Sequence, residues 1–241
     1  MIQLNRSHFL LSVAAWCGML QFVVCVNWAM QVYDGGYSLR HNFLSDLGRT
    51  VSLSGMPNPS CVLFNLSVVI LGIALLGFFV LVPPAVDEGR WFVRVPGILS
   101  ATGIIGIGLT PYDKLFVPHI VALVLWLGPM VLLLIAHVVS SAISGRESNV
   151  TRVLAFATIV AVLGYAIAGT HSGYVFMQKI TASLAIVWLL AIASPISPVY
   201  RATMSYVSER RVLAERQAVQ YMRLLEQGHR RPSVNPRQWE K

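Results

Sequence analysis

Three histidines and two aspartates of this chain are of the residue types that bind metal ions and transfer protons. Together with one nearby asparagine they are His41, Asp46, Asn65, Asp113, His119 and His171. Imidazole nitrogen and carboxylate oxygen are ligands that zinc prefers, and a catalytic zinc keeps one position open for water. On this interpretation His41, His119 and His171 bind a zinc ion. Asp46 or Asp113 is then a further ligand or the general base.

The spacing of these residues matches no local zinc motif such as HExxH, so other interpretations stay open. The polar side chains can cap helix ends and pair with Arg40, Arg49 or Lys114 without any metal. They can also form a site for a lipid head group or for proton handling. Ionisable groups beside membrane spans are costly, which makes each of them a candidate for function.

Six apolar stretches must position these residues, and each is close to the length that crosses a bilayer. They cover residues 9–30, 61–82, 91–109, 117–138, 153–169 and 179–197. A hydrocarbon core about 30 Å thick needs roughly 20 helical residues, and the alternation typical of barrel strands is absent. The chain is 56% hydrophobic and only 12% charged. We therefore predict an all-α polytopic membrane protein whose six transmembrane helices occupy residues 1–198.

Basic residues indicate how this bundle is oriented. Nine of the 18 Lys and Arg residues follow position 200. With six spans both termini share one side, which then holds 14 of the 18 basic residues, against 4 on the other. Since cytoplasmic segments are rich in Lys and Arg, we predict cytoplasmic termini and a long extracytoplasmic first loop.

The basic tail is predicted to form a cytoplasmic juxtamembrane helix and tail over residues 199–241. Basic residues beside a membrane span attract anionic lipids. The residues expected at the membrane surface are Arg201, Arg210, Arg211, Arg216 and Arg223. Because the positive charge gathers in this tail, membrane lipids are the expected partners, and nucleic acid is not.

Within the first loop, residues 38–48 are predicted to form a short helix. Ser38 suits an N-cap and Gly48 a C-terminal cap. Apolar residues recur at every fourth position and predict one packing face: Leu39, Phe43 and Leu47. Asp46 falls at the edge of this face, whereas His41 and Ser45 are expected on the opposite side.

A carboxylate on a packing face needs partners, because an unpaired buried charge is costly. The polar residues near the outer ends of the spans are therefore expected to converge in one cluster: Asp46, Asn65, Asp113, His119 and His171. A second packing prediction concerns residues 91–109, where small residues let neighbouring helices approach closely. These are Gly97, Ser100, Gly103, Gly106 and Gly108.

The segment His41-Asn-Phe-Leu-Ser-Asp-Leu-Gly48, followed by Asn58-Pro-Ser60 and Phe64-Asn65, resembles a bacterial membrane family called domain of unknown function 998. Asp113, His119 and His171 are similar to later positions of that family. The pattern also resembles the eukaryotic DRAM/Sfk membrane family, whose first loop carries an ISD-G motif. The resemblance covers spans one to five. It implies a six-span fold and a place in a bacterial inner membrane, but no chemistry.

A looser likeness links the chain to alkaline-ceramidase-type membrane hydrolases, which use Ser, Asp and three His around zinc. The chain lacks the HxxxH pair of those enzymes. Our leading prediction is an integral membrane protein that binds or senses lipid or a small ligand through the polar cluster. The alternatives are a zinc-dependent intramembrane hydrolase of lipid amide or ester bonds, and a proton-coupled transporter. Against transport, the spans show no paired, broken and charged helices at mid-membrane.

Overall fold

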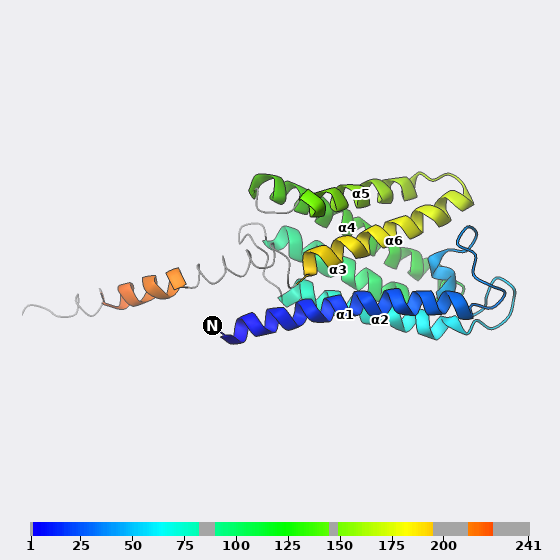
Figure 1. Ribbon diagram of the computed structural model, residues 1–241, viewed down its shortest axis with the longest axis horizontal. Helices are drawn as coiled ribbons and strands as arrows, with labels where there is room; N and C mark the ends of the chain where they lie inside the picture. Colours follow the sequence, from blue (N-terminus) through cyan, green and yellow to red (C-terminus); the bar gives the residue numbers. More distant parts are fainter. Residues whose placement is uncertain (1, 82–89, 145–148, 195–211, 224–241) are drawn as a thin grey trace, which may run out of the picture. The chain divides into compact units, whose positions relative to one another are not determined.

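The computed structural model describes residues 2–81, 90–144, 149–194 and 212–223, and all regular structure within these ranges is helical (Figure 1). Six helices are long and apolar enough to cross a membrane. In chain order the elements are α1 (Ile2–Val32), the 3₁₀ helix η1 (Leu44–Gly48), α2 (Ser60–Leu81), α3 (Arg90–Leu109), α4 (Phe116–Ser144), α5 (Asn149–Ala166) and α6 (His171–Ala193). The predicted polytopic all-α class is thereby confirmed.

The beginning of α6 differs from the prediction by about two turns. The apolar stretch predicted a start at residue 179, whereas the helix begins at His171. Thr170 explains the difference, because its side-chain oxygen accepts a hydrogen bond from the Gly173 N–H and so caps the helix. His171, expected in the connection after span five, is therefore the first residue of α6.

Consecutive helices pack side by side for α1–α2, α2–α3, α3–α4 and α5–α6. The core between them holds large apolar side chains such as Met19, Leu75, Leu134 and Leu189. Many apolar side chains also lie on the outer surface of the helices. An apolar outer surface of this kind suits contact with the hydrocarbon of a membrane, as expected for helices that span it.

Close helix packing around α3 confirms the prediction from its small residues. A Cβ atom added at Gly103 would lie 2.8 Å from the Ala122 carbonyl oxygen of α4. One added at Gly108 would lie 2.7 Å from the Asn65 carbonyl oxygen of α2. Only glycine fits at these two contacts, so α3 is held between α2 and α4.

The first loop, residues 33–59, connects α1 to α2 at one end of the bundle (Figure 1). It does not contain the predicted α-helix over residues 38–48. The backbone makes a turn in which the Asn42 N–H donates to the Ser38 carbonyl, extends at Phe43, and then forms η1. Leu39 is 63% exposed, and only Leu47 of the predicted stripe is fully buried.

The chain divides into two compact units, Met1–Thr203 and Met204–Lys241. In the second unit residues 212–223 form a helix with mostly exposed side chains. Arg216 and Arg223 lie on it, whereas Arg201, Arg210 and Arg211 lie outside the described residues. Binding of this tail to anionic lipid stays a prediction.

Candidate functional site: a polar-ended cavity beneath the first loop

Asp46 lies inside η1 and is only 3% exposed. Its carboxylate accepts a hydrogen bond from the Phe43 N–H at 2.7 Å and faces the Arg49 guanidinium at 3.8 Å. Burial raises the pKa of Asp46 above its ordinary value, although the Phe43 N–H, Arg49, Asn42 and His171 each act to lower it. Asp46 thus stabilises the local fold of η1, and it pairs with Arg49 as the metal-free interpretation expects.

Two asparagines attach the loop to α2. The Asn58 amide nitrogen donates to the carbonyls of Leu47 and Arg49 at 3.0 and 2.9 Å, and its oxygen accepts from the Ser60 hydroxyl at 2.8 Å. The Asn65 amide nitrogen donates to the Gly48 carbonyl at 2.9 Å. Asn65 therefore holds loop backbone, as its place one turn into α2 permits.

Asp113 lies in the short connection between α3 and α4. Its carboxylate accepts the Thr50 N–H at 2.9 Å, the Thr50 hydroxyl at 2.5 Å and the Val51 N–H at 3.2 Å. Burial acts to raise the pKa of Asp113, but these hydrogen bonds outweigh it and leave the pKa below its ordinary value. Asp113 therefore attaches the second half of the loop as a charged acceptor.

The helix α6 holds the first half of the loop through its first three turns. His171 Nε2 lies 3.1 Å from the His41 carbonyl, and the His171 ring meets Phe43 edge to face at 5.1 Å. The Lys179 ammonium donates to the Asn42 carbonyl at 2.5 Å. Gln178 Oε1 accepts the Leu44 N–H at 2.7 Å. The loop is thus attached to α2, to α6 and to the α3–α4 connection.

Beneath η1 the bundle forms a partly open cavity that most of the attached polar residues do not reach. It is lined by residues of α1, η1, α2, α3, α4 and α6: Phe22, Leu44, Ser45, Phe64, Val68, Leu71, Ile104, Ile107, His119, Leu123, Trp126, Gln178, Ala182, Ala185, Ile186 and Leu189. About 60 Å³ of it is open to the centres of water-sized spheres, several times the roughly 10–15 Å³ that one water needs. The atom-free space around this volume, which extends into open solvent, is about 630 Å³.

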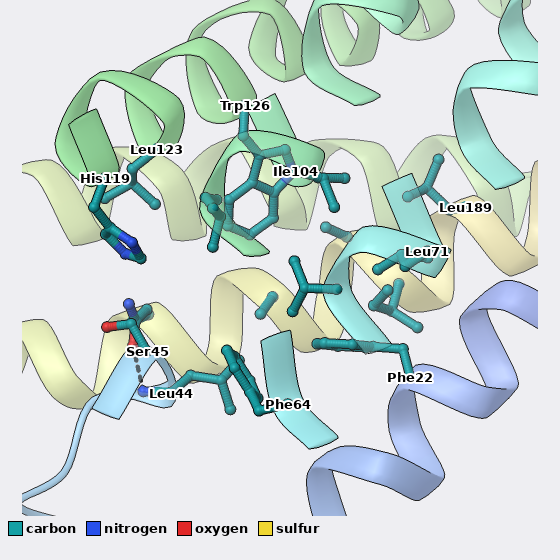
Figure 2. Close-up of a pocket in the computed structure, with 16 residues that line it drawn as sticks. Phe22, Leu44, Ser45, Phe64, Leu71, Ile104, His119, Leu123, Trp126 and Leu189 are labelled. Carbon is teal, nitrogen blue, oxygen red and sulfur yellow. Dashed lines mark hydrogen bonds between the residues drawn. The ribbon is translucent and has the colours of Figure 1, made fainter. Parts of the chain in front are cut away.

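The lining is apolar except at one end. Figure 2 shows His119 and Ser45 at that end, and Phe22, Leu71 and Leu189 at the other. The polar side chains are His119, Ser45 and Gln178, which are 4%, 9% and 8% exposed. Gln178 and Leu189 are 11 residues apart on α6, so the lining extends over about 16 Å.

The predicted polar cluster is consequently divided. Asp46, Asn65, Asp113 and His171 hold different parts of the loop, and only His119 of the five lines the cavity. The physical reason is that the loop backbone brings many N–H and C=O groups to the end of the bundle. Buried backbone groups need partners, and these side chains supply them.

The predicted zinc ligands do not form a ligand set. Within the described parts of the chain, no group of three or more His, Cys, Asp or Glu side chains lies close enough to hold a metal ion. His41 is exposed, and it is its carbonyl oxygen that meets His171, while Asp46 is turned to the Phe43 N–H. His119 has its Nδ1 against the Thr110 carbonyl at 2.7 Å. The residues present therefore do not fit the metal centre that a zinc hydrolase requires.

Sequence reasoning missed Ser45, Gln178 and Trp126 as lining residues and Asn58 as a loop anchor. Gln178 was detectable in principle, as an amide next to a long apolar stretch. Ser45 was placed on the wrong face because the segment was treated as an α-helix.

A scan against protein-family models and searches of curated proteins and of solved structures found no match.

Proposed function

We propose that this integral membrane protein binds an amphipathic small molecule, a lipid or a lipid-like compound, in the cavity beneath η1. One observation carries the proposal: an apolar cavity ends in three buried polar side chains. Pockets that bind small molecules are mostly apolar, with a few polar groups that fix orientation. A ligand with an apolar body and a polar head matches that distribution.

The place of the cavity supports the same proposal. Its lining comes from α1, α2, α3, α4 and α6 together with η1, so the polar end lies under the loop and the apolar end lies deeper in the bundle. An amphiphile that enters from a bilayer has its head near the membrane surface and its chain in the hydrocarbon. The cavity offers the same order of polar and apolar surroundings.

Photolabelling tests the proposal. The protein, reconstituted in phosphatidylcholine nanodiscs, is exposed to an alkyl diazirine probe, and the labelled residues are identified by mass spectrometry. We expect labels on lining residues such as Trp126 and Ile186, in addition to residues that face the bilayer.

The matched variants are Ala185→Leu, which adds bulk at a buried lining position of α6, and Ala166→Leu, which adds the same bulk at an exposed position of α5. Ala185→Leu should remove the labels from the cavity, and Ala166→Leu should leave them. Labels confined to bilayer-facing residues in the unmodified protein contradict the proposal.

A further inference from the structure

The polar end of the cavity has a defined hydrogen-bonding pattern because backbone partners fix two of its side chains. Nδ1 of His119 faces the Thr110 carbonyl at 2.7 Å. A carbonyl oxygen only accepts, so Nδ1 carries the proton and donates. In the neutral ring, Nε2 is then an acceptor, and among the described residues the side chain of His119 bonds only through Nδ1.

Gln178 is fixed in the same way. Its Oε1 accepts the Leu44 N–H at 2.7 Å, which is the dashed line at Leu44 in Figure 2. The nitrogen end of the Gln178 amide therefore points away from the Leu44 N–H, and its NH₂ group offers two N–H donors. Neither this NH₂ nor the Ser45 hydroxyl has a hydrogen-bond partner in the parts of the chain that the structure describes.

The polar end thus offers one acceptor, two amide donors and one hydroxyl, all uncharged in this state. His119, Ser45 and Gln178 do not bond to one another, so water or a molecule bound in the cavity is their partner. An ionised head group would bring a charge next to these three buried side chains, none of which carries an opposite charge, and this is costly. A carboxylate would also place its acceptor oxygens against the His119 Nε2 lone pair.

We infer that the cavity selects an amphiphile whose uncharged head carries both a hydrogen-bond donor and an acceptor, namely an alcohol or a primary amide. The inference rests on the proposed function. The head donates its proton to His119 Nε2, and its oxygen accepts from the Gln178 NH₂ or the Ser45 hydroxyl. The alkyl chain lies against Phe64, Leu71 and Leu189.

Competition against the photoprobe in nanodiscs tests this selectivity. The competitors share one chain length: decane, decanol, decanamide, decanoate and decyltrimethylammonium. They are compared at about pH 8, where a carboxylic acid is ionised. We expect decanol and decanamide to compete at concentrations at least about tenfold lower than the two ions, since each ion leaves a hydrogen-bonding group of the polar end unpaired. Dioleoylglycerol, a two-chain lipid with the same hydroxyl head, distinguishes a membrane lipid from a single-chain alcohol as the source of that head.

Two variants separate head recognition from folding. His119→Asn keeps an N–H for the Thr110 carbonyl but removes the Nε2 acceptor, and Ser45→Ala removes only a hydroxyl. In both variants we expect decane to compete as in the unmodified protein. The preference for decanol over decanoate should fall to about threefold or less in His119→Asn, which loses the acceptor for the head's proton, and should persist in Ser45→Ala, where the Gln178 NH₂ still donates to the head. Retained competition by decane shows that the cavity has kept its form.

The outcomes distinguish the two proposals. If no competitor, decane included, reduces cavity labelling, the proposed function fails. If all five compete equally in the unmodified protein, the cavity binds alkyl chains without head recognition, water satisfies the polar end, and this inference alone is overturned. A preference for decanol over decanoate that persists in His119→Asn also overturns it, because the recognition then lies elsewhere.

Discussion

Asp113 gives the sharpest test of how the first loop is attached to the bundle. It is the single residue of the α3–α4 connection that accepts three hydrogen bonds from the loop: two from Thr50 and one from Val51. Replacing Asp113 with alanine removes all three acceptor contacts but leaves the loop sequence unchanged. The perturbation therefore isolates one attachment point.

The expected loss of stability follows from the number and kind of these bonds. A hydrogen bond to a charged group contributes about 1.5–3 kcal/mol, and the site is only partly buried, so water replaces some of what is lost. We expect Asp113→Ala to lower the free energy of unfolding by about 2–4 kcal/mol. Asp113→Asn keeps one acceptor oxygen and should cost about half as much.

The pH dependence has a definite sign. The hydrogen bonds lower the pKa of Asp113 in the folded state below its ordinary value of 3.8. The contribution of the ionised group is therefore complete above this value and is lost as the pH falls through the folded pKa. The stability difference between the unmodified protein and Asp113→Ala should be constant near neutral pH and shrink only in the acid range below 3.8.

Thermal unfolding in detergent and hydrogen exchange followed by mass spectrometry measure the two effects. The amides of Thr50 and Val51 should exchange faster in Asp113→Ala, whereas the amides in the middle of α2 should not change. The adjacent Lys114→Ala is the control, because the Lys114 side chain is exposed and makes no hydrogen bond to the described residues of the loop. Unchanged unfolding and unchanged exchange in Asp113→Ala would refute the reasoning that this carboxylate anchors the loop.

Three further predictions concern other contacts in the same unit. Asp46→Asn should change stability by less than about 1 kcal/mol near neutral pH. Because burial raises the pKa of Asp46, the unmodified protein should gain stability relative to this variant as the pH falls, which an unfolding series against pH will detect. Asn58→Asp places a carboxylate oxygen against backbone carbonyls and should cost at least about 3 kcal/mol, measured as the loss of folded protein in detergent. Gly103→Ala overpacks the α3–α4 contact and should cost about 1–3 kcal/mol in thermal unfolding, whereas Gly128→Ala, with nothing within 4 Å of the added atom, should cost nothing.

The membrane spans were predictable because hydrocarbon imposes a length and a composition on any helix that crosses it. The sequence also indicated that polar residues gather at one end of the bundle. What they do there was not predictable, because their partners are loop backbone groups whose positions depend on the fold of the loop. Asp113 illustrates this: its acceptor role requires Thr50 and Val51, which are distant in sequence.

The misplacement of Ser45 has a similar cause. An α-helical period of about 100° per residue puts it opposite the apolar stripe. The backbone instead extends at Phe43 and continues as η1, in which Ser45, Asp46, Leu47 and Gly48 are all buried. A short element wedged into the end of a bundle has neighbours on every side, so periodicity carries little information about which of its residues are buried.

Gln178 connects the attachment of the loop with the cavity. Its oxygen holds the Leu44 N–H of η1, and its nitrogen belongs to the polar end of the cavity. A ligand that binds the amide nitrogen would orient the same planar group whose oxygen holds η1. By linkage, a ligand that requires η1 in place must stabilise η1 by the free energy of its binding. On the proposed function, occupancy of the cavity and order in the first loop are therefore one equilibrium, and the loop is the part of the molecule through which occupancy could be sensed at the surface.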